Sequence, residues 1–286
     1  MIAPVPHAVV VDAVARALAE DLGGAGDVTS AATIGAGVQA RAILVARAAG
    51  VIAGLPLVVE TCRQVDAGIL VGLSASDGDM VEAGAVVATL TGPAQGILTA
   101  ERTALNFVGH LSGIATATRR LVDAVAGTRA RIADTRKTTP GLRALEKYAV
   151  RCGGGVNHRF GLDDAVLIKD NHIVAAGGVG AAVRAARTHA SHMVTIEVEV
   201  DTLAQLDEAL DAGAQVVLLD NMSPADLAIA VMRIGGRAVA EASGGITLEG
   251  VRAVAEAGVD VISSGWITHS APRLDVALDV VSNPRG

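Results

Sequence analysis

The chain from residue 131 onward repeats one pattern of apolar and polar positions. Short apolar runs that end in polar residues occur at RIADT, DAVLIKDN, VTIEVEVD, AQVVLLDN, RAVAEASGG and DVISSG. Stretches with helical spacing separate the later runs, at TLAQLDEALDAG, SPADLAIAVMRIGG and TLEGVRAVAEAG. Alternating strands and helices are typical of parallel strands joined by right-handed crossovers. The pattern therefore predicts an α/β barrel, either complete or open.

Local signals predict where these helices begin and end. Thr202 and Gln205 have the spacing of a capping box. Ser223 is a suitable N-cap, and Pro224 follows it at the first helical position. Glycines follow the three helical stretches, at Gly213, Gly235 and Gly258.

The chain before about residue 105 has a different pattern. Residues 7–22 have helical spacing, ARAILVARAAGVIAG predicts two strands around a turn, and LPLVVETCRQV predicts a helix. SASDGDMVEAGAVVATLTGP resembles the hammerhead of lipoyl and biotinyl carriers, but no lysine precedes Lys137, so a carrier role is excluded. We predict a small half-barrel domain, followed by a long apolar helix over residues 105–127.

Composition favours a soluble cytoplasmic enzyme. Aromatic residues make up 1% of the chain and the net charge is −7, which argues against both single-stranded and nonspecific duplex nucleic acid as partners. No run approaches the roughly 20 apolar residues of a membrane span, and the N-terminus has no basic leader. Cys62 and Cys152 are too few for a disulfide framework or a zinc site.

Positive charge is nevertheless concentrated between residues 131 and 159. Two acidic residues, Asp134 and Glu146, oppose seven basic side chains, so the local balance is 7 − 2 = +5. The basic residues are Arg131, Arg136, Lys137, Arg143, Lys147, Arg151 and Arg159, and His158 lies beside the last of them. Arginine is favoured where a carboxylate or phosphate accepts two parallel hydrogen bonds. Part of the cluster also fits a basic helix on the surface, because Arg143, Lys147 and Arg151 share one helical face.

Polar residues recur where the predicted strands end. Because the carboxyl ends of barrel strands meet at one mouth, we expect these side chains to converge there. They are Asp134, Lys169, Asp170, Glu197, Glu199, Asp220, Asn221, Glu241, Ser243, Ser263 and Ser264. Glu197 and Glu199 point to the same face of their strand and are expected to face the mouth. A simple ion pair between Glu197 and a nearby Lys or Arg stays open.

Two glycine-containing loops near the end of the chain are candidates for phosphate binding. SGGITLEGV and SGWITHS each follow a strand and are expected to open a helix, whose free N–H groups suit phosphate. His269 would add a further donor. Together with the basic cluster, these loops predict a polyanionic ligand that carries phosphate and carboxylate groups.

These stretches resemble one enzyme family. DTRKTTPGLRALEKYAVRCGGGVNHRFGLDDAVLIKDNH is similar to the signature of the quinolinate phosphoribosyltransferases, also called nicotinate-nucleotide pyrophosphorylases (carboxylating). The likeness continues through TAERTALNFVGHLSGIAT, EVEVDT, LLDNM, EASGGI and SGWITHS, over most of residues 20–275. It implies an N-terminal α/β sandwich over residues 1–108, joined by segment 272–286, and an open α/β barrel over residues 109–271.

The resemblance also implies a reaction and its participants. Quinolinate and phosphoribosyl pyrophosphate would give nicotinate mononucleotide, pyrophosphate and CO₂, with Mg²⁺, in de novo NAD biosynthesis. The family implies a homodimer with shared active sites, and whether dimers assemble into a hexamer stays open. No membrane and no nucleic acid would be involved.

The family's functional residues fall on definite positions of this chain. Quinolinate would contact Arg102, Arg136, His158, Arg159 and Lys169, with Arg102 coming from the partner subunit. Lys137, Glu199 and Asp220 would be catalytic, and Glu199 and Asp220 would also serve the magnesium. Phosphate would be held by Ser243, Gly244, Gly245, Ser264, Gly265 and His269.

Two rival functions stay open at this point. Lys169, at a strand end, could form a Schiff base in an aldolase-like lyase, which requires a desolvated or cation-flanked lysine. Within the transferases, a relative that uses nicotinate or another small acid is the closer alternative.

Overall fold

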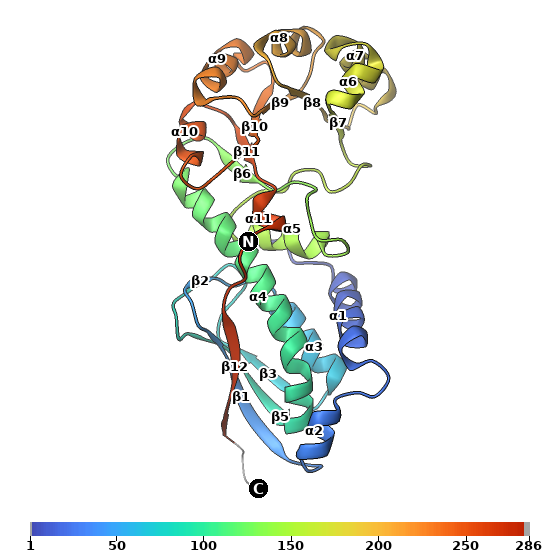
Figure 1. Cartoon of the computed structure of the whole chain (residues 1–286), viewed down its shortest axis with the longest axis vertical. Helices are drawn as coiled ribbons and strands as arrows, with labels where there is room; N and C mark the ends of the chain where they lie inside the picture. Colours follow the sequence, from blue (N-terminus) through green and yellow to red (C-terminus); the bar gives the residue numbers. More distant parts are fainter. Residues whose placement is uncertain (1, 283–286) are drawn as a thin grey trace. The chain divides into compact units, whose positions relative to one another are not determined.

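The chain forms two compact units. The first comprises residues 1–119, 139–154 and 271–286, and the second comprises residues 120–138 and 155–270. The computed structural model describes residues 2–282 (Figure 1). The boundary predicted between residues 108 and 109 falls within helix α4 (Ala94–Ala124), which runs without a break. Residues 283–286 of the predicted C-terminal segment lie outside the described residues.

Close packing of α5 (Arg143–Cys152) on α4 explains why residues 139–154 belong to the first unit and not to the barrel. Helix α5 is followed by Gly153, where a Cβ atom would overlap the carbonyl oxygen of Ala115. His110 Nε2 on α4 also lies 2.9 Å from Oε1 of Glu146, whose side chain is fully buried.

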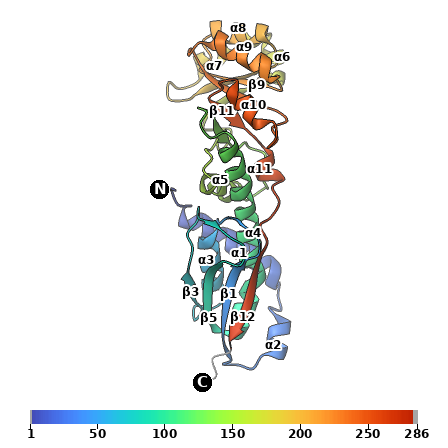
Figure 2. The same ribbon diagram turned by 90° about the vertical axis from the view of Figure 1, so that its left-hand side faces the viewer.

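An antiparallel sheet forms the centre of the first unit. Its strands lie in the order β12 (Val276–Ser282), β1 (Gln39–Ala46), β5 (Val86–Pro93) and β3 (Leu70–Leu73). Every second residue of β1 from Ala40 to Ala46 is buried, so one face of the sheet packs on the core. Helices α3 (Leu55–Val65) and α4 cover this face, and α1 (His7–Leu22) packs on α3 (Figure 2). This layered arrangement is the predicted sandwich.

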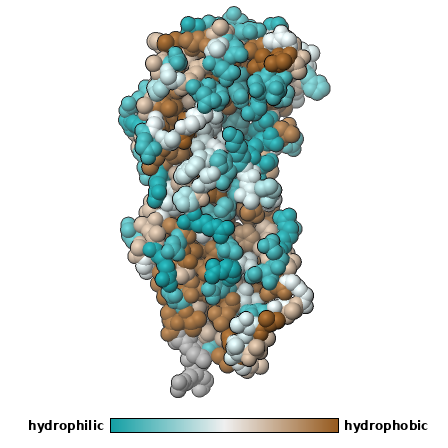
Figure 3. Space-filling model, in the orientation of Figure 1, coloured by the Kyte–Doolittle hydropathy of each residue, from teal (hydrophilic) through white to brown (hydrophobic). Residues whose placement is uncertain are grey.

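Smaller elements complete the first unit. Helix α2 (Val28–Thr33) begins at Asp27, whose side chain accepts a hydrogen bond from the Ser30 N–H. Strands β2 (Gly50–Val51) and β4 (Met80–Val81) form a separate antiparallel pair. On the face drawn in Figure 3, apolar residues gather over the strands of the four-stranded sheet. In β12, Val280 and Val281 are exposed.

The second unit contains a parallel sheet of six strands. Their order is β6 (Arg131–Ala133), β11 (Val261–Ser263), β10 (Val239–Ser243), β9 (Val216–Asp220), β8 (Ile196–Val200) and β7 (Val166–Ile168). Within residues 2–282 no pairing joins β7 back to β6, so the barrel is open as predicted. An isolated parallel bridge links Ala133 to Val156.

Helices flank the strands of this open barrel (Figure 1). They are α6 (Asp170–Ala176), α7 (Val179–His189), α8 (Leu203–Asp211), α9 (Pro224–Ile234), α10 (Val251–Glu256) and α11 (Trp266–His269). The predicted capping box of Thr202 and Gln205 is confirmed at α8, and the Ser223 side chain accepts from Asp226 N at α9. None of the helices within residues 2–282 is long and apolar enough to cross a membrane.

The first prediction concerns Gly113 in α4. Alanine is normally better than glycine inside a helix by about 1 kcal/mol. At Gly113, however, a Cβ atom would overlap the carbonyl oxygen of Pro272 and lie 2.9 Å from the Arg273 Cα. Overpacking of this kind costs roughly 1–3 kcal/mol. We expect Gly113→Ala to lower the free energy of unfolding, measured by denaturant titration.

Gly24→Ala is the matched control, because nothing lies within 4 Å of a Cβ atom at that position. A Gly113→Ala variant as stable as the wild type would contradict close packing of α4 on the Pro272 backbone.

Candidate functional site

A cavity of about 410 Å³ lies at the carboxyl ends of the barrel strands. All of its lining residues belong to the second unit. They are Thr135, Arg136, Lys137, His158, Arg159, Leu167, Lys169, Glu199, Leu218, Asp220, Glu241, Ser243 and Ser263. Eight of them are residues to which the family resemblance gives a role, so most of that set converges on one place, and the predicted strand-end residues Glu241 and Ser263 lie there too.

Asp134 holds two cation-bearing segments together at this mouth. It follows β6 directly, is fully buried and precedes Arg136 in the chain. Its Oδ1 accepts a hydrogen bond of 2.9 Å from the His158 N–H, and its Oδ2 accepts from the Asn157 side chain. The segment that carries His158 and Arg159 is thereby fixed beside the strand end that leads to Arg136.

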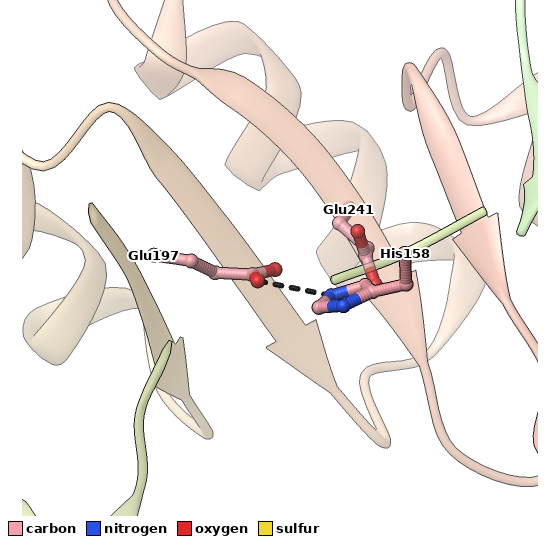
Figure 4. Close-up of side chains that lie close together, drawn as sticks. All are labelled: His158, Glu197 and Glu241. Atoms are coloured by element: carbon pink, nitrogen blue, oxygen red, sulfur yellow. Dashed lines mark ion pairs between the residues drawn. The ribbon is translucent and has the colours of Figure 1, made fainter. Parts of the chain in front are cut away.

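His158 lies between two buried glutamates (Figure 4). Its Nε2 is 3.0 Å from Glu197 Oε2 on β8 and 3.6 Å from Glu241 Oε1 on β10. Its other ring nitrogen, Nδ1, accepts a hydrogen bond of 2.8 Å from the Arg159 N–H. The ring proton therefore lies on Nε2 and points at the glutamates. Glu197 thus pairs with His158.

His158, Glu197 and Glu241 also have the side-chain types of a metal centre, with ligand atoms within 4.8 Å of one another. The hydrogen bond to Nδ1 argues against that use, because Nε2 carries the proton and has no lone pair to donate. The cluster instead holds a proton on Glu241, because burial and the charge of Glu197 raise the pKa of Glu241 to about 7. His158 and a hydrogen bond from Ser263 lower it, and Asp134 raises it further.

Within residues 2–282, each of the two arginines at the mouth has one nitrogen without a hydrogen-bond partner. Nε of Arg136 and Nε of Arg159 are buried and have no hydrogen-bond partner among the described residues, although Arg159 Nη1 donates to Ala165 O at 2.9 Å. Burial and then the charge of Arg136 lower the pKa of Arg159, against the opposing charges of Glu197 and Asp164. Two cations held close together, with free donors, are suited to an anion that carries more than one charge.

Lys169 follows β7 and pairs with Glu199 at the end of β8. Its Nζ lies 3.0 Å from Glu199 Oε2, and its side chain is 49% exposed. A Schiff-base lysine requires an amine of lowered pKa, whereas this amine is half exposed and has a carboxylate partner. The pair instead presents one cation and one carboxylate at the rim of the cavity.

The predicted phosphate loops lie on β10 and β11. Gly244 and Gly245 both have positive φ, and they follow Ser243, which lines the cavity. Helix α10 begins only at Val251, because a turn over residues 248–250 intervenes. Its N-terminus is thus separated from the two glycines, which differs from the prediction.

The second loop lies close to Lys137. Helix α11 begins directly after Gly265, as predicted, and a Cβ at Gly265 would lie 2.8 Å from Lys137 Cδ and 3.3 Å from His269 Cδ2. Thr268 Oγ1 donates to the Lys137 carbonyl at 2.7 Å. Gly244, Gly245, Ser264, Gly265 and His269 are not among the lining residues of the cavity. Arg102 belongs to the first unit, on α4, with its side chain 65% exposed.

Some features of the site were not predicted. The sequence places Glu241 and Ser263 at the mouth, and both line the cavity, but it assigns no role to either. Thr135 lines the cavity next to Arg136. No pattern in the sequence indicated the hydrogen bonds of Asp134, because its partners lie more than twenty residues further along the chain.

The fold is an open α/β barrel, and its cavity presents several cationic side chains at the carboxyl ends of the strands. Two family descriptions match the chain: "Quinolinate phosphoribosyl transferase, N-terminal domain" over residues 27–112 and the corresponding "C-terminal domain" over residues 114–279. The chain belongs to the quinolinate phosphoribosyltransferase family.

Individual relatives agree with this assignment. The chain is 48% identical over 275 residues to the nicotinate-nucleotide pyrophosphorylase [carboxylating] of Mycobacterium leprae, covering 94% of this chain and 96% of that protein. It is 42% identical to a quinolinate phosphoribosyltransferase [decarboxylating] of Nicotiana tabacum, covering 92% and 80%. The structure of the nicotinate-nucleotide pyrophosphorylase from Francisella tularensis matches with a TM-score of 0.94 at 42% identity, covering 98% and 99%.

The second prediction concerns the pH dependence of stability. Because the pKa of Glu241 is raised in the folded state, that state binds a proton which the unfolded chain releases at lower pH. Stability is therefore lost as the pH rises from about 4.5 toward and through 7, by at most ~3 kcal/mol at 1.36 kcal/mol per pKa unit. The glutamine of Glu241→Gln is neutral at every pH, so the variant lacks this pH dependence.

We expect Glu241→Gln to gain stability over the wild type as the pH rises from 5 to 8, measured by denaturant titration at each pH. Glu249→Gln, at an exposed glutamate eight residues further on, should follow the wild type throughout. Parallel pH profiles for wild type and Glu241→Gln would contradict a protonated Glu241.

Proposed function

We propose that the chain transfers the phosphoribosyl group of phosphoribosyl pyrophosphate to quinolinate, with release of pyrophosphate and CO₂, to give nicotinate mononucleotide. The observation that carries this proposal is the pair of buried, unpartnered Nε atoms of Arg136 and Arg159 at an open cavity. Quinolinate has two adjacent carboxylates, which match two neighbouring cations. The names of the relatives support the same reaction.

The quinolinate site in this proposal consists of groups that are already oriented. Asp134 and Glu197 fix His158, and the Ala165 carbonyl accepts from the guanidinium of Arg159. Lys169, held by Glu199, supplies another cation at the rim. Because little reorganisation is needed, a rigid dicarboxylate binds at low entropic cost.

Phosphoribosyl pyrophosphate would occupy the opposite side of the cavity. Its phosphate would lie against Ser243, Gly244 and Gly245, and against Ser264, Gly265 and His269. Lys137, which lies beside Gly265, would neutralise the leaving pyrophosphate. Glu199 and Asp220 line the cavity and carry carboxylate oxygens, the ligand type that Mg²⁺ prefers, so these residues would hold the metal with the pyrophosphate. Bound Mg²⁺ would add to the neutralisation of pyrophosphate charge.

The two chemical steps then need no further cofactor. As the bond from ribose C1 to pyrophosphate breaks, positive charge grows at C1, and the carboxylates of Glu199 and Asp220 are placed to stabilise it. The quinolinate nitrogen forms the new bond to C1 and becomes positive. The neighbouring ring carbon then loses CO₂, and the electron pair left behind is stabilised by that nitrogen until a proton replaces the carboxylate.

The proposal extends to assembly and location. A homodimer would supply Arg102 of each subunit to its partner's site, and dimers could associate further into a hexamer. A cytoplasmic location agrees with the use of soluble substrates. The direct test is formation of nicotinate mononucleotide and CO₂ from quinolinate, dependent on phosphoribosyl pyrophosphate and Mg²⁺. Transfer to nicotinate without CO₂ would instead indicate the mono-acid relative.

The third prediction concerns Arg136. Removing one member of a desolvated charge pair typically costs about 2–5 kcal/mol. Arg136→Ala should therefore lower kcat/KM for quinolinate by roughly 10²-fold or more, at 1.4 kcal/mol per tenfold. Calorimetric binding of phosphoribosyl pyrophosphate should change far less, because the phosphate loops lie on β10 and β11.

Arg233→Ala is the control for Arg136→Ala. Arg233 lies on α9 and pairs with Asp207 at the surface, so its loss should leave both ligands unaffected. If Arg136→Ala weakens both ligands equally, the basic cluster does not select the dicarboxylate.

The fourth prediction tests the proposed shared site. Arg102→Ala and Lys169→Ala should each be inactive as homodimers. After the two variants are mixed, dissociated and re-associated, hybrid dimers should hold one intact site and recover part of the activity. Mixtures that stay inactive, despite hybrid formation shown by mass spectrometry, would contradict a contribution of Arg102 in trans.

A further inference from the structure

Asn221 stands out because of its backbone. It follows β9 and is the single non-glycine residue with positive φ, at 53°, within residues 2–282. A left-handed conformation costs an L-residue roughly 1–2 kcal/mol, although asparagine tolerates it better than most residues. Such strain persists where the surroundings fix it, and it is concentrated at functional sites.

Three contacts hold Asn221 in this conformation. Its side-chain Nδ2 donates to Oδ2 of Asp220 at 2.6 Å. Its backbone N–H donates to the carbonyl oxygen of Ser243 at 2.9 Å. Its amide also occupies the space where a side chain at Gly244 would begin, since a Cβ atom there would lie 2.5 Å from Asn221 Cγ and overlap its Oδ1.

These contacts connect an acidic residue of the cavity, Asp220, with the candidate phosphate loop that begins at Ser243. Asp220 is a carboxylate that lines the cavity, and Ser243 lines it from the neighbouring strand, where the two residues are partners in the sheet. Gly244 follows Ser243 in the candidate phosphate loop. The side chain of Asn221 therefore lies against both the acidic residue and the loop.

We propose that Asn221 is a positioning residue that sets the rotamer of the Asp220 carboxylate and the path of the Ser243–Gly245 loop, so that the two bind phosphoribosyl pyrophosphate as one unit. This inference rests on the proposed function. Asn221 acts through Asp220 and the loop, and it need not touch the substrate. The quinolinate side of the cavity, built on Asp134 and His158, does not depend on it.

Asn221→Gly tests whether the side chain of Asn221, and not only its backbone conformation, is needed for ligand binding. Glycine adopts positive φ without strain, so the variant should be as stable as the wild type or more so. It loses the donor to Asp220, however. We expect calorimetric binding of phosphoribosyl pyrophosphate with Mg²⁺ to weaken about tenfold, equivalent to ~1.4 kcal/mol. Quinolinate binding should change less than about twofold on the same scale.

Asn221→Asp is a second, independent test of the hydrogen bond from Asn221 to Asp220. Aspartate keeps the size of the side chain and tolerates the left-handed region, but it places a carboxylate oxygen where Nδ2 donates to Asp220. It should weaken phosphoribosyl pyrophosphate binding at least as much as Asn221→Gly. In steady-state assays both variants should raise KM for phosphoribosyl pyrophosphate more than KM for quinolinate.

Ser223→Ala is the matched control in the same loop. It removes the N-cap of α9 and should lower stability by about 0.5–2 kcal/mol, yet leave phosphoribosyl pyrophosphate binding unchanged. Unchanged binding in Asn221→Gly, or equal loss of both ligands, would overturn the positioning role. A wild-type protein that binds no phosphoribosyl pyrophosphate would overturn the proposed function, and this inference with it.

Discussion

The buried carboxylate of Asp134 is the interaction on which the arrangement of the site depends. It accepts from the His158 N–H and from Asn157, and so fixes the segment after the glycine-rich turn beside the end of β6. Both cation-bearing segments then face one cavity. Without this acceptor, the half-buried backbone N–H of His158 would lose its partner, and such a loss costs roughly 1–3 kcal/mol when the donor is fully buried.

Charge is layered at the mouth of the barrel. Arg136, Arg159 and Lys169 line the cavity together with the buried Glu241, while Asp134 and Glu197 are buried and are not among the lining residues. These buried carboxylates offset the repulsion among the cations, and the proton on Glu241 limits the negative charge that burial would otherwise penalise. An acidic protein can thus present a local cationic surface, with donors left free for a ligand.

Much of this architecture could be predicted from the sequence, because it depends on local patterns. The strand and helix alternation predicted an α/β barrel, complete or open, and the caps at Thr202 and Ser223 lie where they were predicted. Arg136, His158, Lys169 and Asp220 converge because parallel strands end at one edge. The unit boundaries could not be read in the same way, since α4 continues through them and α5 packs back on α4 through contacts distant in sequence. The separation of α10 from Gly244 depends on a turn that the Gly-Gly pattern does not specify.

Ligand selection by wild-type protein tests the central claim most directly, because the claim is that the cation cluster recognises two adjacent carboxylates. Calorimetric titration with quinolinate and, separately, with nicotinate compares a dicarboxylate with the corresponding mono-acid on an unaltered site. Each additional charged hydrogen bond is worth about 1.5–3 kcal/mol. Quinolinate should therefore bind at least tenfold more tightly at 1.4 kcal/mol per tenfold. Equal affinities for the two ligands would contradict the claim.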